Sequence, residues 1–540
     1  MKSIGNKIAS WLSPDHSWRC TLALVLSGLL TGLCVSFAVF GCLEWISLVP
    51  ALYVFFRASF DPSVPLRRLY RYGLIFYYSF SIVLFHWFFY MYPLEFVGVS
   101  PAAALGIVLF AILGLSLLQT LFAALFPVIL AIISRGRIVK AHPFLQVLVM
   151  AGLWCVREWA QTLNWTGVPW GRLALGQAAM PIMLQTARWF GSYAITFVIV
   201  LINGCIAYAF LHANRRRLCA LVGLAVFAVQ LSLGAFLTLA NVTKPEQETY
   251  RVAAIQGNIG SADKWETSAT QSFDIYYNLT EQAAKSGADI ILWPETAVPI
   301  KLTEYEYYMN QLRRLACEHE SILLLGVFVR GTELGDYNAI VLIDQNGELY
   351  DGFYAKRHLV PFGEYVPLRP LIEVICPPIL ELSQLADGTT PGADAEVFDT
   401  LAGGIGSLIC FDSIYEQLAY DSVRHGAELI CISTNDSWFF DSAAVHMHNA
   451  QAKLRAIETG RYVVRAANTG VSSVITPTGR EVARLDPLKE GVIMAEIEMR
   501  SDMTLYTRIG NSFVYLFLGG ALLLLAERVY QGIKQRKKEI

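Results

Sequence analysis

Three residues have side chains that could together make an activated nucleophile, and two of them, Cys410 and Glu295, stand at the ends of predicted strands. Cys410 ends the small, apolar run 403–410, and a helix-like run starts near residue 414. Free N–H groups at the start of a helix favour negative charge, so we expect a lowered thiol pKa and a nucleophilic thiolate at Cys410. Glu295 follows another buried run, where apolar surroundings would raise its pKa and suit it to general acid–base catalysis. Lys356 offers a fixed positive charge.

Each of these residues also has an ordinary structural interpretation when it is taken alone. A cysteine after a small apolar run is more often a core residue. A glutamate after a proline is usually a cap or a surface acid, and a single lysine is usually solvated. A cysteine, a carboxylate and a cation that open to one end of a sheet would, however, make a nucleophile with its activating base.

The elements that must position these residues are of two kinds. Hydrophobic residues make up 55% of the 540-residue chain, against about 45–50% in soluble proteins, and the excess lies before Val242 and after Asn511. Between them, apolar strands alternate with helices, which predicts an α/β domain of about 250 residues with sheets covered on both faces. Strands are expected at 251–256, 289–293, 321–328, 338–344, 405–410, 428–434, 462–467 and 472–476, and helices near 266–286, 303–319, 413–425 and 443–459.

Eight apolar stretches are long enough to cross a bilayer. They lie near 19–36, 38–56, 72–91, 102–133, 144–162, 185–211, 218–240 and 511–528. The first stretch continues into the next without a small-residue cleavage site, so we expect no cleaved signal peptide. The predicted organisation is a seven-span transmembrane domain over 1–242, a catalytic domain over 243–508, and a C-terminal transmembrane helix with a basic tail over 509–540.

Basic residues predict how the chain is oriented in the membrane. They gather near 2–7, 57–71, 135–140, 215–217 and 534–538, whereas the loop 92–100 has none. Every basic cluster therefore falls on one side, which the positive-inside rule makes cytoplasmic together with both termini. Seven spans then place the middle region outside the cytoplasm. Arg157 and Glu158 lie within an apolar stretch, and they could serve function or simply face polar partners.

Charge and cysteine usage exclude several classes of protein. The formal net charge of −2 predicts no nucleic-acid partner, because phosphate binding needs a basic face. The ten cysteines lack metal-ligand spacing, so neither a disulfide framework nor a metal site is expected. The connection 360–385 is unusually rich in Pro, Leu and Ile. It could dip into lipid or cover an apolar substrate, or it could fold back on its own core.

The motifs around the three residues resemble those of a known superfamily. Trp293-Pro294-Glu295, the stretch 356–364 that opens with Lys356 and closes with Glu364, and Leu408-Ile409-Cys410-Phe411-Asp412 are similar to the catalytic motifs of nitrilases. Together with the apolar N-terminal part and the last span, nearly the whole chain resembles the membrane-bound apolipoprotein N-acyltransferase family. The stretches 256–259 and 504–511 and Trp265 also match that family.

The resemblance implies a fold, a site and a reaction. The extracytoplasmic domain would be an αββα sandwich beside a polytopic α-helical membrane domain. Glu295 would be the general base, Cys410 the nucleophile and Lys356 the group that steadies the oxyanion, with Glu364 and Trp265 near the site. The family commonly carries Tyr-Glu after the nucleophile, whereas this chain has Phe411 and Asp412, so details of substrate positioning would differ.

The implied substrates are both lipidic. An acyl chain would pass from a membrane phospholipid, typically phosphatidylethanolamine, to a cysteine thioester and then to the α-amino group of the diacylglyceryl cysteine of an apolipoprotein. No cofactor would be needed. The enzyme would be a multi-pass protein of the bacterial inner membrane, with its catalytic domain in the periplasm and both termini in the cytoplasm.

Two other functions are compatible with parts of the sequence. A membrane-tethered nitrilase-like amidase would resolve the thioester with water, although a soluble amide substrate would not require so large a membrane region. A transporter or receptor would use the outer domain only to bind a ligand, and replacing Cys410 would then leave its function unchanged.

Overall fold

The computed structural model describes residues 17–94, 99–241, 248–260, 268–333, 335–375 and 388–539. The chain divides into two compact units, which are described separately. The first comprises residues 1–86, 109–239 and 509–540, and the second comprises 87–108 and 240–508. Residues 87–108 include most of the short helix η2 (His86–Met91) and the start of α6.

The first unit is helical. Its helices are α2 (Ser17–Ser36), α3 (Glu44–Ser47), α4 (Val49–Phe60), α5 (Leu66–Leu84), α6 (Pro101–Ala123), α7 (Leu125–Ser134), α8 (Arg137–Ala141), α9 (Leu145–Ala160), α10 (Ala187–Phe190), α11 (Ser192–Leu211), α12 (Arg216–Ala240) and α20 (Ser512–Glu539), with short 3-10 helices η1 (Ala38–Leu43), η4 (Leu173–Gln177), η5 (Pro181–Leu184) and η6 (Ala213–Arg215).

Six helical stretches in the described residues are long and apolar enough to cross a membrane. They are Ser17–Ser36, Ala38–Phe60, Pro101–Ser134, Ser192–Leu211, Ala213–Ala240 and Ser512–Arg536. The other two expected spans coincide with α5 and α9. Helix α5 has three arginines in its first six residues, which is too many charges for an apolar span of 18 residues. Helix α9 has only 16 residues, which is too short for such a span. The expected count of eight is therefore approximate.

Glu158, a buried acid within the helical unit, has polar partners. The buried carboxylate of Glu158 accepts hydrogen bonds from Leu173 N (3.0 Å) and Thr196 Oγ1 (2.8 Å), and Arg157 NH2 lies 3.9 Å from Glu158 Oε1. These contacts favour a structural role for the pair, because they satisfy a backbone N–H where η4 begins.

The second unit contains two six-stranded sheets and their covering helices. Its strands are β1 (Thr249–Gln256), β2 (Ile290–Leu292), β3 (Ile322–Thr332), β4 (Gly335–Ile343), β5 (Tyr354–Ala355), β6 (Val397–Thr400), β7 (Gly403–Ile409), β8 (Leu429–Thr434), β9 (Tyr462–Ala467), β10 (Ser472–Ile475), β11 (Glu481–Leu485) and β12 (Gly491–Glu498). Its helices are α14 (Ala269–Lys285), η7 (Leu302–Glu304), α15 (Glu306–His319), α16 (Arg369–Ile375), η9 (Cys410–Ile414), α17 (Glu416–Arg424), η10 (Ser437–Phe439), α18 (Ala443–Thr459) and α19 (Leu505–Ile509).

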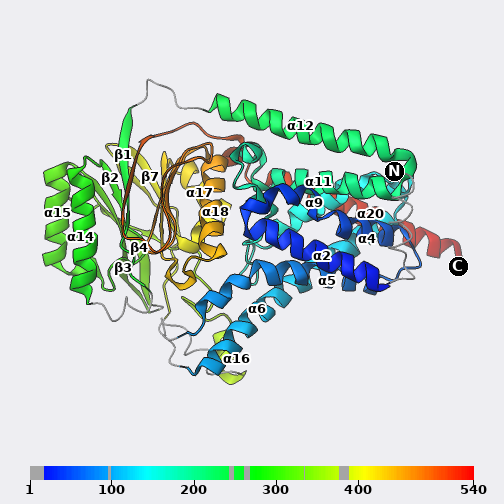
Figure 1. Ribbon diagram of the computed structural model, residues 1–540, viewed down its shortest axis with the longest axis horizontal. Helices are drawn as coiled ribbons and strands as arrows, with labels where there is room; N and C mark the ends of the chain where they lie inside the picture. The colour runs from blue at the N-terminus through cyan, green and yellow to red at the C-terminus, as the bar shows by residue number, and fades with distance from the viewer. Residues whose placement is uncertain are drawn as a thin grey trace. The chain divides into compact units, whose positions relative to one another are not determined.

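The two sheets have matching topologies. Their strand orders are β12-β1-β2-β3-β4-β5 and β11-β10-β9-β8-β7-β6. Strands β1, β2 and β3 are parallel, as are β7, β8 and β9. Helices α14 and α15 cover the outer face of the first sheet, and α17 and α18 cover that of the second (Figure 1). The unit is therefore the αββα sandwich that the resemblance implied.

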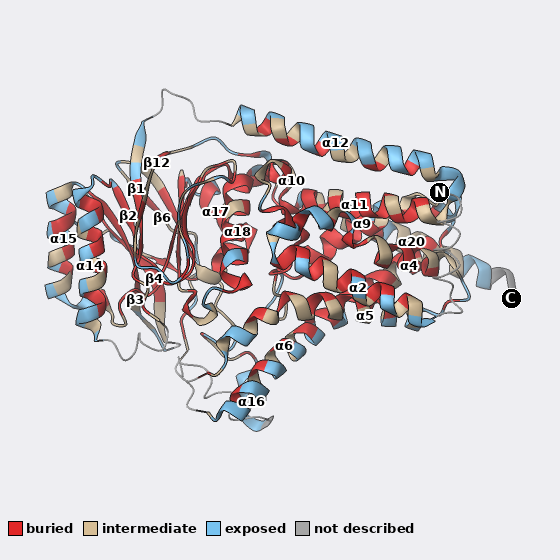
Figure 2. Ribbon diagram, viewed as in Figure 1, coloured by how far each residue is buried: buried red, intermediate tan, exposed pale blue. Residues whose placement is uncertain are grey.

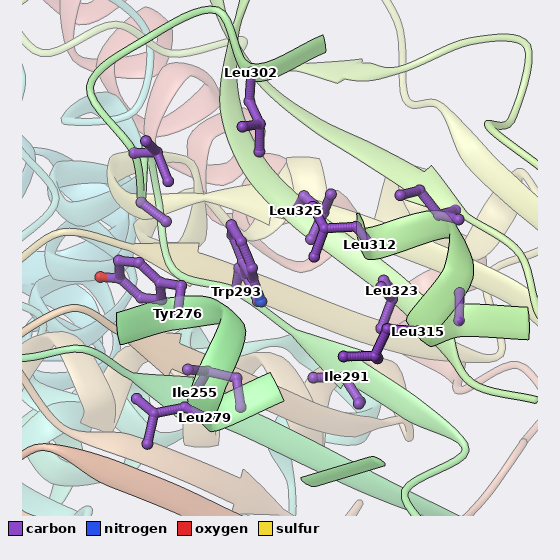
Figure 3. Packing of buried hydrophobic residues seen from close by; sticks show 14 of the residues in the cluster. Ile255, Tyr276, Leu279, Ile291, Trp293, Leu302, Leu312, Leu315, Leu323 and Leu325 are labelled. Atoms are coloured by element: carbon purple, nitrogen blue, oxygen red, sulfur yellow. The ribbon is translucent and has the colours of Figure 1, made fainter. Parts of the chain in front are cut away.

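Burial explains why the strands are continuous apolar runs. One core lies between the first sheet and its helices, and it contains Trp293, its ring neighbour Tyr276 and the leucines Leu312 and Leu315 of α15 (Figure 3). A second core lies between the two sheets, and both faces of each central strand are buried (Figure 2). All eight expected strands are present. The sequence missed β5, which has two residues, and the half-exposed or edge strands β6, β11 and β12.

Candidate active site

The carboxyl ends of the parallel strands supply the candidate catalytic residues. Cys410 directly follows β7, and Glu295 comes three residues after β2. Asn435 directly follows β8, and Lys356 directly follows the two-residue strand β5. Ligands of α/β sheets bind at these strand ends, because the loops that leave a sheet there face a common space.

Local packing fixes Glu295. Trp293 is fully buried and its indole nitrogen donates to Thr280 Oγ1 (2.7 Å). A side chain at Gly326 on β3 would collide with the backbone of Pro294 and Glu295, so glycine allows the close approach there. Thr296 has a φ of 43°, a conformation that is uncommon outside glycine. The result is a tight turn that projects the Glu295 carboxylate from the sheet.

Lys356 lies between two carboxylates. Its Nζ atom is 2.8 Å from Glu295 Oε1 and 3.0 Å from Glu364 Oε1, and its side chain is only 2% exposed. Asn338 Nδ2 donates to the same two oxygens, at 2.7 and 3.0 Å. Burial alone would lower the pKa of Lys356, but the two carboxylates hold it well above its usual range. The ammonium therefore stays charged.

The second oxygen of Glu295 joins the two sheets. Glu295 Oε2 accepts a hydrogen bond from Asn435 N (2.9 Å) at the end of β8. The expectation of apolar surroundings for this carboxylate is therefore wrong, because its partners are an ammonium, an amide and a backbone N–H. Such partners favour the ionised form, which is the form that a general base requires.

Cys410 occupies a strained turn. Its φ is 48°, and its side chain is half-buried. Burial and the negative charges of Glu295 and Asp436 raise the pKa of its thiol, against the opposing effects of Lys356 and Thr434. The predicted lowering of this pKa is therefore wrong, because burial and the charge of Glu295 oppose the thiolate, and η9, which begins at Cys410, has only five residues. The resting site holds a thiol, and a base must remove its proton.

Asp412 links the turn of the nucleophile to the segment that carries the lysine. Its carboxylate accepts hydrogen bonds from Tyr354 Oη (2.8 Å) and His358 N (2.7 Å). Burial raises the pKa of Asp412 to about 6, although these donors act in the opposite direction. The neighbouring ring of Phe411 packs edge-on against Tyr415 with centroids 5.3 Å apart. Asp412 is thus a positioning group, and Phe411 packs in a small aromatic cluster with Tyr415.

The structure brings together Glu295, Lys356, Glu364 and Cys410, whereas Trp265 lies outside the described residues. The sequence did not single out Asn338, Asn435, Asp436 or His448, all buried or half-buried close to these groups. Asn435 and Asp436 follow the predicted strand 428–434, and Glu295 lies two residues after the predicted strand 289–293. Their position at a strand end could therefore have marked them as candidate site residues. Asn338 lies within a strand and gave none.

Comparison with known proteins identifies the family of the chain. A model described as carbon-nitrogen hydrolase matches residues 251–503, and one described as apolipoprotein N-acyltransferase N-terminal domain matches residues 27–205. An apolipoprotein N-acyltransferase from Gloeobacter violaceus is 31% identical over 96% of this chain and 95% of that protein. The chain belongs to the apolipoprotein N-acyltransferase family. It is accordingly an acyltransferase and a membrane protein.

Further relatives carry the same name. An apolipoprotein N-acyltransferase from Methylococcus capsulatus is 32% identical over 74% of this chain and 78% of that protein. One from Geobacter metallireducens is 29% identical over 94% and 95%. Among solved structures, an amidase from Nesterenkonia sp. aligns with 51% of this chain and 97% of that chain, at 16% identity and a TM-score of 0.38, which is too low to carry an argument.

Proposed function

We propose that Cys410 accepts an acyl chain from a membrane phospholipid and passes it to the N-terminal amino group of a diacylglyceryl apolipoprotein. Family membership supports lipoprotein N-acylation with a lipid donor and a lipoprotein acceptor in general. Phosphatidylethanolamine as the donor, and the diacylglyceryl cysteine as the acceptor, are the specific substrates that we propose.

One observation carries the proposed mechanism. A charged ammonium, Lys356 Nζ, lies 2.8 Å from the carboxylate of Glu295, and both groups act electrostatically on the Cys410 thiol. The raised pKa of the Cys410 thiol keeps its proton on the sulfur before reaction, beside a carboxylate that can accept it. A neutral nucleophile beside its base is the arrangement that general-base catalysis needs.

In the first half-reaction, the Cys410 sulfur attacks the ester carbonyl carbon of the phospholipid while its proton moves to Glu295. Lys356 stabilises the oxyanion, for which one well-placed donor contributes about 2.7–4 kcal/mol. The carbon–oxygen bond then breaks, and Glu295 returns the proton to the departing lysophospholipid hydroxyl. The products are a thioester on Cys410 and a lysophospholipid.

In the second half-reaction, the acceptor amine attacks the thioester carbonyl. Glu295 takes a proton from the nitrogen, Lys356 again stabilises the oxyanion, and the carbon–sulfur bond breaks as the proton returns to the sulfur. An amide forms and the Cys410 thiol is restored. Because two half-reactions use one base and one cation, no metal or diffusible cofactor enters the proposed cycle.

We further propose that the catalytic domain, residues 243–508, lies in the periplasm against the lipid surface, between a transmembrane domain over 1–242 and the C-terminal helix and tail over 509–540. The exposed apolar side chains of Leu368, Leu371 and Val374 support contact with lipid or an acyl chain. Within residues 360–375, the described part of the connection 360–385, these exposed side chains argue against the alternative that the connection folds back on its own core. The distribution of basic residues supports cytoplasmic termini.

Incubation with labelled phospholipid and a diacylated lipopeptide tests this function. N-acylated peptide is the expected product, and release of free fatty acid alone would favour an amidase-like hydrolase. Cys410→Ala and Glu295→Gln should abolish transfer while the protein remains folded and membrane-inserted. An active Cys410→Ala preparation would contradict the proposal.

A further inference from the structure

We propose that a buried chain of Asp436, His448 and Ser413 is a positioning device that holds the turn of the nucleophile in its reactive geometry. This inference rests on the proposed role of Cys410. None of the three residues exchanges a proton or a bond in the mechanism above, yet the chain ends on the backbone carbonyl of Cys410 itself.

The contacts form a continuous path. Arg465 NH2 lies 2.7 Å from Asp436 Oδ2, and Asp436 Oδ1 lies 2.8 Å from His448 Nδ1. The other ring nitrogen, Nε2, lies 2.9 Å from Ser413 Oγ and 3.1 Å from Cys410 O. Ser413 Oγ also donates to Cys410 O, at 2.7 Å. The carbonyl of Cys410 is therefore held by two groups at once.

The order of serine, histidine and aspartate matches that of a hydrolytic triad, but burial rules out a second nucleophile here. Ser413 and Asp436 are 0% exposed and His448 is 2% exposed, so a substrate cannot reach the hydroxyl. The Cys410 sulfur, a carboxylate oxygen of Asp436 and a ring nitrogen of His448 lie within 4.8 Å of one another, a spacing that is also found among metal ligands. The Asp436 carboxylate is already paired with Arg465, however, and both ring nitrogens of His448 have protein partners. We therefore interpret the cluster as a positioning network.

Asp436 is the acidic member of the network. Its Oδ1 atom lies against His448 Nδ1, and the other ring nitrogen, Nε2, faces both the Ser413 hydroxyl and the Cys410 carbonyl oxygen. Burial alone would raise the pKa of Asp436, but His448 and Arg465 lower it to about 2.

The network also reaches the base. Asn435, which donates its backbone N–H to Glu295 Oε2 at 2.9 Å, directly precedes Asp436. A side chain at Gly470 would collide with the Asp436 carboxylate, so glycine lets this acid sit deep at the end of β8. One short segment thus fixes the nucleophile through His448 and the base through Asn435. Cys410 needs this support because its φ of 48° is strained.

The test compares His448→Gln and Ser413→Ala with His446→Gln, a matched control on the same helix whose ring is 45% exposed and pairs with Asp441. Two rates are measured for each purified, full-length variant: formation of the Cys410 thioester from labelled phospholipid, and alkylation of Cys410 by iodoacetamide. Thermal unfolding is recorded in parallel. Ser413→Thr, which keeps the hydroxyl, serves as the rescue variant.

We expect thioester formation to fall about 100-fold in His448→Gln and Ser413→Ala, the size expected for a misplacement of about 1 Å. Ser413→Thr should recover most of the rate, and His446→Gln should match wild type in both rates. Folded His448→Gln and Ser413→Ala proteins with wild-type rates would overturn the inference. Failure of both to fold would also overturn it, since the network would then serve stability and not positioning. Absence of the thioester in wild type would instead refute the proposed function.

Discussion

Replacing Lys356 by methionine should separate the stabilising and catalytic effects of its charge. The substitution keeps the length of the side chain but leaves Glu295 and Glu364 without their shared cation. Their Oε1 atoms lie 2.7 and 3.0 Å from the same nitrogen of Asn338, so they are at most about 5.7 Å apart. At an effective dielectric constant of about 20, two charges at that distance repel by about 3 kcal/mol.

The expected result has two parts. Breaking a buried ion pair from one side costs about 3–5 kcal/mol, and a domain of this size shifts its unfolding temperature by about 2–4 °C per kcal/mol. Lys356→Met should therefore unfold about 6–20 °C below wild type and lose at least about 100-fold in transfer rate. The double variant Lys356→Met/Glu364→Gln removes one of the two negative charges. It should regain most of the stability and none of the activity.

Thermal unfolding and labelled-phospholipid transfer measure the two parts on the same preparations. Lys301→Met is the matched control, because Lys301 pairs with Asp336 at 2.9 Å while a third of each side chain is exposed, and such pairs contribute at most about 1 kcal/mol. Equal stability of Lys356→Met and Lys301→Met would contradict a buried ion pair at Lys356. Acyl transfer by the double variant at the wild-type rate would contradict the catalytic role of the lysine charge.

Three further predictions concern single groups. Burial raises the pKa of Asp412 from 3.8 to about 6, so the folded state binds this proton more tightly than the unfolded state. The free energy of unfolding, relative to that of Asp412→Asn, should be greatest below pH 4 and fall by about 3 kcal/mol as the pH rises to 7. A difference between the two proteins that is independent of pH would contradict this. Tyr354→Phe removes the 2.8 Å hydrogen bond to Asp412 and should cost about 1–3 kcal/mol in unfolding experiments; an unchanged unfolding midpoint would argue against Asp412 as a link. Cys317, which is exposed, should react in intact spheroplasts with a membrane-impermeant maleimide, and labelling only after lysis would contradict a periplasmic domain.

The strand pattern predicted an α/β domain with covered sheets because the central strands are short continuous apolar runs bounded by helices, whereas the αββα arrangement was implied by the family resemblance. Runs such as 428–434 and 462–467 are buried on both faces in the structure, where β8 and β9 form. Strands at the rims, such as β11, alternate between half-buried and exposed residues, so they lack that pattern. The matching topology of the two sheets had no counterpart in a sequence repeat.

The candidate site was predicted in its members but not in its electrostatics. Cys410 and Glu295 stand at predicted strand ends, which sequence patterns can locate, whereas Lys356 follows β5, a two-residue strand that the sequence did not predict. The direction of the Cys410 pKa shift depends first on burial and then on the charge of Glu295, which comes close to the thiol only in three dimensions. Likewise, Asn338 contacts both glutamates from within β4, and no local motif marks it.

Mass spectrometry of the intact protein after exposure to phospholipid, without an acceptor, tests the central claim most directly. The account predicts the mass of one acyl chain, located on the peptide that contains Cys410, and its disappearance when a diacylated lipopeptide is added. An enzyme that transfers acyl chains at full rate while the Cys410 peptide remains unmodified, with or without the acceptor, would contradict the account.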